Sequence, residues 1–201
     1  MRRAGMGAAA LAVVAMALGA GLAAGPARAG KDAVGVGPVF VPPLVLQDQT
    51  AATSAAAAAA RAAEEVTLAR DFCRRLAQKE YVIDCLAAEI GAVADRMPDD
   101  PTLAPAKAAL SDASRKLGRI VEANRSTTLK PGVARASGRS SPRALRPVET
   151  ARLDVATDAA IGVIEETGTI LLRSSETSDE AAGFVAISTA VTSNTLLLRS
   201  I

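Results

Sequence analysis

Apolar residues recur every three or four positions along the middle of the chain, and this spacing is typical of an amphipathic helix. The longer of two such stripes consists of Ile83, Leu86, Ile90, Val93 and Met97. A shorter stripe precedes it and consists of Leu68, Phe72 and Leu76. Residues 77–80 lie between the stripes and contribute no apolar anchor. We therefore predict two helices joined by a tight turn near residues 78–81.

The two cysteines of the chain lie on either side of this turn. Cys73 and Cys85 are twelve residues apart, which in one continuous helix is a distance of about 18 Å. A disulfide needs Cα atoms roughly 4–7 Å apart, and a hairpin with its tip near Lys79 brings the cysteines to matching heights. We favour this disulfide-bridged hairpin. The alternatives are one long helix that Glu80 interrupts, and two free cysteines buried as small apolar residues.

Helical periodicity resumes after the sharpest break in the sequence, Pro98-Asp-Asp-Pro101. Proline ends the preceding helix and is tolerated at the start of the next. The same three–four spacing then predicts a third helix from Leu103 to about Ser126, and residues 149–173 predict a fourth. Both patterns span only two or three heptads, which suits a helical bundle rather than a long coiled coil.

The last predicted helix runs from Phe184 to Leu198 and belongs to a segment, residues 181–198, that carries no charge. A membrane span is therefore an alternative interpretation. The segment is at the short limit for crossing a bilayer and contains six Ser, Thr and Asn side chains. We favour a buried bundle helix and expect no transmembrane span in the mature chain.

The N-terminal segment has the features of an export signal. Arg2 and Arg3 precede the apolar run Ala8–Ala20, and Ala27-Arg-Ala29 is a small-x-small cleavage site. Retention as an N-terminal anchor is the alternative to cleavage. Export places the protein in the periplasm or outside the cell, where paired cysteines persist as disulfides. The following residues, 30–48, are rich in Gly and Pro, and we expect an extended arm there.

Composition points to an all-α protein. Alanine dominates, aromatic residues make up 2% of the chain, and sheets are usually rich in β-branched and aromatic residues. We predict a bundle of about five helices with a disulfide-stapled hairpin and a long basic crossover linker. The expected parts are a signal peptide (1–29), an extended arm (30–48), a three-helix segment (49–126), a flexible basic linker (127–148) and a C-terminal helix pair (149–201).

Charge is distributed unevenly along the chain. Residues 127–148 contain no Asp or Glu, and their five cations are Lys130, Arg135, Arg139, Arg143 and Arg146. We consider these five residues as candidate contacts with an anionic envelope surface or an acidic protein. Two alternatives stay open: the segment folds back onto the acidic helices of its own chain, or it is a solvated linker. Since no aromatic residue lies between the arginines, base stacking lacks support, and we expect no nucleic-acid partner.

The sequence lacks the residues that most catalytic mechanisms need. Without a single His in the chain, neither a Ser-His-Asp nor a Cys-His nucleophile can be built. Adjacent acidic pairs such as Glu64-Glu65 and Glu165-Glu166 point in different directions on a helix, so we interpret them as solvated faces. We identify no catalytic, cofactor-binding or metal-binding residue and expect a protein that is not an enzyme.

Two functions remain as hypotheses. The favoured one is a non-catalytic, exported, bacterial-type envelope protein that acts through helix surfaces and electrostatic interaction. The alternative is a periplasmic or secreted helical-bundle protein that binds a small apolar ligand. The sequence gives no indication of the oligomeric state.

Overall fold

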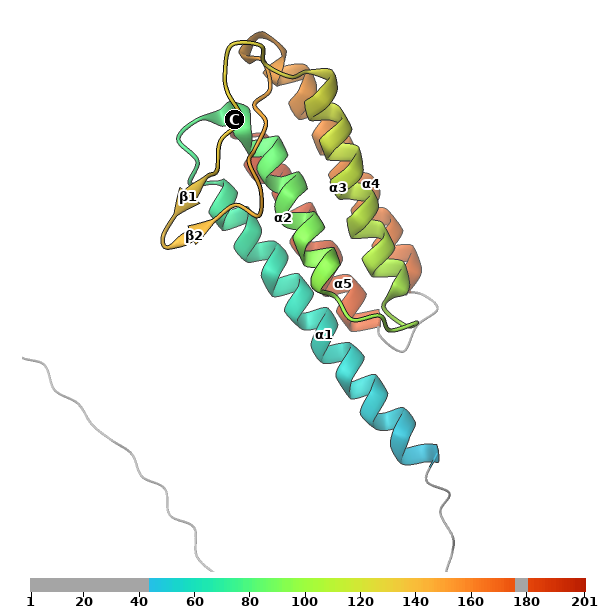
Figure 1. Cartoon of the computed structure of the whole chain (residues 1–201). Helices are drawn as coiled ribbons and strands as arrows, with labels where there is room; N and C mark the ends of the chain where they lie inside the picture. Colours follow the sequence, from blue (N-terminus) through green and yellow to red (C-terminus); the bar gives the residue numbers. More distant parts are fainter. Residues whose placement is uncertain (1–43, 176–180) are drawn as a thin grey trace, which may run out of the picture. The chain divides into compact units, whose positions relative to one another are not determined.

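Helices make up nearly all of the regular structure of the described chain (Figure 1). The computed structural model describes residues 44–175 and 181–201, with side chains from residue 54 onward. Its α-helices are α1 (Leu44–Cys73), α2 (Val82–Arg96), α3 (Ala104–Ala123), α4 (Leu153–Ser175), α5 (Ala181–Thr192) and α6 (Asn194–Leu198). Single 3₁₀ turns, η1 (Lys79–Tyr81) and η2 (Thr150–Arg152), precede α2 and α4. The predicted all-α bundle is confirmed.

The five long helices form a closed ring of neighbours. In chain order α1 packs on α2, α2 on α3, α3 on α4 and α4 on α5, and α5 returns to pack on α1. The short α6 packs on α4. The first and last long helices of the described chain therefore share an interface, and the core of the bundle is continuous from Ala55 to Leu198.

Helix α2 is the most deeply buried part of the bundle. Every residue from Val82 to Ile90 is buried, so the helix is covered on all sides rather than along one stripe. The apolar residues of this segment account for its place in the core. Two carboxylates, Asp84 and Glu89, are buried with them and expose none of their surface, and both need partners inside the protein.

The predicted hairpin and its disulfide are both present. Cys73 is the last residue of α1, residues 74–78 make the turn, and η1 leads into α2. Cys73 and Cys85 are bonded, with their Cα atoms 5.7 Å apart, and both side chains are fully buried. The bond links the end of α1 to the first turn of α2. The disulfide also fits a protein that folds in an oxidising compartment.

Small residues allow the helices to approach one another closely. A Cβ atom added to Gly183 of α5 would lie 2.6 Å from the Cβ of Ala59 on α1. A Cβ on Gly91 of α2 would lie 2.6 Å from Oγ of Ser114 on α3, and that hydroxyl donates across the interface to the carbonyl of Ala87 at 2.7 Å. The Ala-rich sequence of α1 thus serves a close helix–helix contact.

Residues 127–148, which we predicted as a flexible linker, are folded onto the bundle, and we call them the strap. Strands β1 (Arg135–Ala136) and β2 (Arg139–Ser140) pair antiparallel. Ser137 and Gly138 connect them, with φ values of 50° and 75°, as a two-residue hairpin turn requires. Gly132 and Leu145 exchange backbone hydrogen bonds of 3.0 and 2.8 Å. The prediction of a flexible linker is therefore wrong.

The predicted N-terminal elements lie largely outside the described residues. These include the signal peptide, residues 1–29, and residues 30–43 of the arm. The remainder of the predicted arm, residues 44–48, is helical, since α1 begins at Leu44. The helix thus begins earlier than we predicted, because a proline directly before the first turn is compatible with a helix and the sequence after Pro43 contains no residue that prevents one.

The uncharged C-terminal segment, Ala181–Leu198, is long and apolar enough to cross a membrane by length and composition alone. In the fold it forms α5 and α6, separated at Ser193. Four of its apolar side chains, Phe184, Ile187, Val191 and Leu198, are fully buried, whereas Val185 and Leu196 are exposed. The packing of α5 on α1 and α4 thus accounts for the buried part of this apolar segment.

Candidate functional site

Asp84 anchors one end of the strap to α2. Its carboxylate accepts hydrogen bonds from Arg143 at 2.5 and 2.8 Å, and from the backbone N–H and guanidinium of Arg146 at 2.7 and 2.8 Å. Burial acts to raise the pKa of Asp84, but the hydrogen bonds from Arg143 and Arg146 outweigh it and hold the pKa below its ordinary value. Asp84 is therefore ionised in the folded protein at neutral pH.

Glu89 anchors the hairpin part of the strap, one and a half turns further along α2. Oε2 of Glu89 accepts a hydrogen bond from Arg139 of β2, and the guanidinium of Arg139 also lies over the Phe72 ring, 5.3 Å from its centre. Oε1 of Glu89 is buried and has no hydrogen-bond partner among the residues that the structure describes. Burial raises the pKa of Glu89, and the attraction of Arg139 and Arg96 does not cancel that effect.

Burial thus raises the pKa of Glu89, whereas hydrogen bonds lower the pKa of Asp84. Substituting Glu89 by Gln tests this difference. A raised pKa means that the folded state binds the Glu89 proton more readily than the unfolded state does. Stability due to this group is therefore present at low pH and lost as the pH rises from 4.5, the ordinary value, through the folded pKa. We expect Glu89→Gln to be as stable as the wild type, or up to about 1 kcal/mol more stable, at pH 7.

Urea denaturation of both proteins at several pH values measures this effect. The advantage of Glu89→Gln over the wild type should shrink as the pH falls toward 4.5, because a protonated Glu89 resembles Gln. A loss of more than about 2 kcal/mol in the variant at pH 7 would contradict the prediction, since it would mean that the charged form of Glu89 stabilises the fold.

The five cations that we predicted to contact an anionic surface divide into two groups. Arg139, Arg143 and Arg146 pair with buried carboxylates, and Arg146 also pairs with Glu122 at 3.1 Å. Lys130 and Arg135 are exposed, and neither makes an ion pair within the described residues. Contact with an anionic surface stays a prediction for all five. Arg139, Arg143 and Arg146 also show that the segment folds back onto its own helices, which was the alternative.

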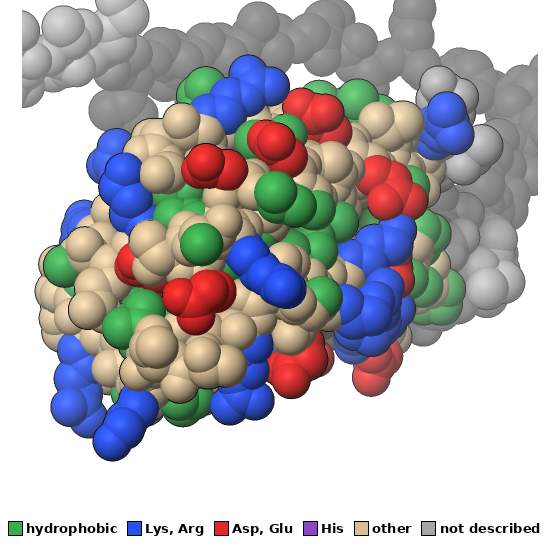
Figure 2. Space-filling view, turned by 90° about the horizontal axis from the view of Figure 1, so that it is seen from above, with side chains coloured by type: hydrophobic (Ala, Val, Ile, Leu, Met, Phe, Trp, Pro, Cys, Tyr) green, Lys and Arg blue, Asp and Glu red, His purple; other side chains and the backbone are tan. Residues whose placement is uncertain are grey.

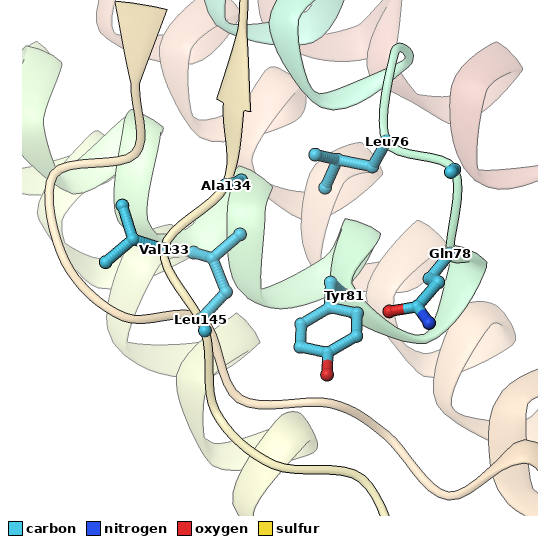
Figure 3. A pocket seen from close by; sticks show the side chains of 8 residues that line it. Leu76, Gln78, Tyr81, Val133, Ala134 and Leu145 are labelled. Atoms are coloured by element: carbon cyan, nitrogen blue, oxygen red, sulfur yellow. The ribbon is translucent and has the colours of Figure 1, made fainter.

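An open apolar cleft of about 330 Å³ lies between the strap and the turn after α1. Its lining residues are Leu76, Ala77, Gln78, Tyr81, Gly132, Val133, Ala134 and Leu145. In Figure 3 Leu76 points from the turn toward Ala134 and Leu145 of the strap, with the Tyr81 ring between the two walls. Five of the eight are aliphatic, and the only polar side chains are those of Gln78 and Tyr81. No periodicity in the sequence indicated this cleft.

Both walls of the cleft are held in place by contacts with the rest of the bundle. The turn that carries Leu76 and Gln78 lies inside the loop that the Cys73–Cys85 disulfide closes. The strap wall is fixed by Leu145, which is fully buried, and by the adjacent Arg146 on Asp84. Tyr81 joins the two walls, since its hydroxyl donates to the carbonyl of Lys130 at 2.7 Å. The cleft is thus formed in advance of any ligand.

The end of the bundle that includes the strap carries charges of both signs. Figure 2 shows Lys and Arg side chains both at the edge and near the middle of this face, with Asp and Glu side chains and hydrophobic areas among them. Within residues 54–175 and 181–201, no group of three or more His, Cys, Asp and Glu side chains is placed to hold a metal ion. Larger hollows of about 510 and 370 Å³ lie elsewhere on the described surface. We take the cleft as the candidate site because the disulfide and the Asp84 ion pairs hold both its walls.

Comparisons of this chain with protein-family models, with curated proteins and with solved structures find no match. The assignment of a function therefore rests on the residues and geometry of the chain itself.

Proposed function

We propose that this protein is a non-catalytic binding protein that takes a small apolar ligand in the cleft between the strap and the turn after α1. The observation that carries the proposal is the cleft itself, with aliphatic walls and a volume of about 330 Å³. Sites for small molecules typically measure about 300–1,000 Å³ and are lined mainly by apolar side chains with a few polar groups. Gln78 and Tyr81 are the polar groups in this cleft.

Two further features support binding rather than catalysis. The eight residues that line the cleft include no Asp, Glu, Lys, Arg or Cys, so the lining offers neither a charged acid–base group nor a thiol. The disulfide and the Asp84 ion pairs hold the walls in place, and a preformed site avoids the cost of ordering its walls when a ligand binds. The cleft thus suits reversible binding.

This proposal selects the second of the two functions expected from the sequence. The first relied on helix surfaces and on the basic segment, and three of the five cations of that segment are paired with carboxylates of the same chain. We retain the expected compartment, the periplasm or the outside of the cell. Its support is the export-signal pattern of residues 1–29 together with the disulfide.

Titration with octan-1-ol, followed by the ¹H–¹⁵N NMR signals of the protein, tests the proposal. We expect saturable shifts that are concentrated on the amides of residues 76–78 and 132–134. A bulky side chain at Ala77, which lines the cleft, should occupy the same space, so Ala77→Phe should weaken binding at least about tenfold. Ala57→Phe is the matched control, because Ala57 is exposed on α1 and away from the lining.

Two kinds of result in these titrations would overturn the proposal. Shifts that are absent, that do not saturate or that spread over all helices would overturn the proposal. Equal binding by Ala77→Phe and the wild type would show that the ligand occupies another part of the protein, and would also overturn it.

A further inference from the structure

Charged residues flank the cleft, although its own lining is uncharged. The first wall belongs to residues 74–81, where Arg74, Arg75 and Lys79 flank the lining residues and Glu80 is the only acidic residue. The second wall belongs to the first half of the strap, where Lys130 and Arg135 flank Gly132, Val133 and Ala134. Residues 127–136 contain no acidic residue. An uncharged cleft thus lies between two cationic segments.

Two of these five cations make hydrogen bonds, and the other three make no ion pair among the described residues and can meet a ligand. Arg75 donates to Oγ of Ser137 at 2.6 Å, and Lys79 donates to the carbonyl of Ile201 at 3.0 Å. Within the described chain Arg74, Lys130 and Arg135 are exposed and make no ion pair. The backbone of Lys130 is fixed beside the cleft, because its carbonyl accepts the hydrogen bond from Tyr81. Arg135 directly follows Ala134 of the lining and is held in β1. Because successive side chains of a strand alternate between its two faces, the long side chain of Arg135 must reach around the strand to meet a ligand at the border.

Apolar walls and a cationic border together select a class of ligand. A neutral apolar molecule would leave the cations without a role, and a small inorganic anion would gain nothing from Leu76, Ala134 and Leu145. A molecule with an apolar chain and an anionic head satisfies both parts of the site. The volume of about 330 Å³ is at the lower end for ligand sites, which favours one short chain over a two-chain lipid.

We propose that the ligand is a free single-chain amphiphile with an anionic head group, of the medium-chain carboxylate type. Its chain lies in the cleft, and Lys130 and Arg135 hold its head group at the border. This inference rests on the proposed function and adds the chemical class of the ligand. It also assigns a role to the two cations of the strap that the ion pairs with α2 leave free.

The test compares octanoate with octan-1-ol, which has the same chain length without the charge. At pH 7 and low salt we expect octanoate to bind roughly fivefold more tightly. The ratio should approach one at about 1 M salt, where the Debye length falls to about 3 Å. In the series hexanoate, octanoate and decanoate, each added methylene should tighten binding about fourfold.

Charge variants locate the head group. The double variant Lys130→Gln with Arg135→Gln should lose the preference for octanoate and keep the affinity for octan-1-ol. The matched control is Arg61→Gln with Arg173→Gln. It removes two exposed cations, on α1 and α4, that make no ion pair within the described residues, and it should behave as the wild type. Both double variants change only exposed side chains, so both should fold.

The results distinguish a failure of the ligand class from a failure of the proposed function. Equal affinity of the wild type for octanoate and octan-1-ol would overturn this inference and leave the proposed function intact. Absence of binding by both compounds would overturn the two together. Binding to vesicles of equal phosphatidylcholine and phosphatidylglycerol without any octanoate shift would also overturn the inference, because it would identify the cations as a membrane contact.

Discussion

Replacing Asp84 by Asn should lower the free energy of unfolding by about 3 kcal/mol at pH 7. The substitution keeps the shape of the side chain but removes the charge that pairs with Arg143 and Arg146. It also leaves a buried amide facing two guanidinium groups, and an amide nitrogen cannot accept their hydrogen bonds. The effect is limited because both arginines are partly exposed, to 41% and 28%, and can regain water.

Urea denaturation at pH 7 measures this loss, with Asp95→Asn as the control. Asp95 is an exposed residue of the same helix and makes no ion pair within the described residues, so its substitution should cost less than about 0.5 kcal/mol. A depressed pKa gives stability that is full above the ordinary value of 3.8 and is lost as the pH falls through the folded pKa. The wild type and Asp84→Asn should therefore converge only in acid. Equal stability of the two at pH 7 would contradict the assigned role of Asp84.

Removing the disulfide should have an effect of similar size. The bond between Cys73 and Cys85 closes a loop with a sequence separation of 12. In the chain-entropy model such a loop contributes about 3 kcal/mol, because it restricts the unfolded chain. The double variant Cys73→Ala with Cys85→Ala should unfold at correspondingly lower urea concentration. Its dependence on urea should be steeper, since an unlinked chain exposes more surface on unfolding.

A reducing agent supplies the internal control for this prediction. Both sulfurs are fully buried, so the wild type should be reduced only as fast as it opens, and its reduced form should match the double variant. The stability of the double variant in urea should not change when the reducing agent is added. Unfolding of the oxidised wild type and the double variant at the same urea concentration would contradict a stabilising role for the bond.

Local patterns in the sequence predicted the helices well. The spacing of Ile83, Leu86 and Ile90 identified α2, and the geometric conflict between one helix and a disulfide located the turn after α1. These predictions succeeded because both depend on residues at most about a dozen positions apart. Boundaries were less accurate: α1 begins at Leu44, before its alanine-rich run, because nothing in the sequence after the prolines prevents an earlier start.

The strap could not be predicted in the same way. Its stability comes from pairs such as Arg143 with Asp84, which are 59 residues apart, and no periodicity indicates such a pair. Two signals were present nonetheless. Ser137-Gly138 is a turn dipeptide, and Asp84 and Glu89 are acidic residues within an otherwise apolar stretch. Buried acids on one element and a basic segment without acids elsewhere together indicate that the two associate. The cleft escaped prediction because it forms only where the strap meets the turn.

The position of the disulfide also determines what a protease can do to this protein. Arg74, Arg75 and Lys79 are exposed cleavage sites for trypsin-like enzymes, and all three lie within the loop that the bond closes. A cut at any of them would leave two polypeptides joined through Cys73 and Cys85. Such a nicked molecule would keep its mass on a non-reducing gel and separate into two fragments only after reduction. The wall of the cleft could thus be cut in an oxidising compartment without the release of α1 from the bundle.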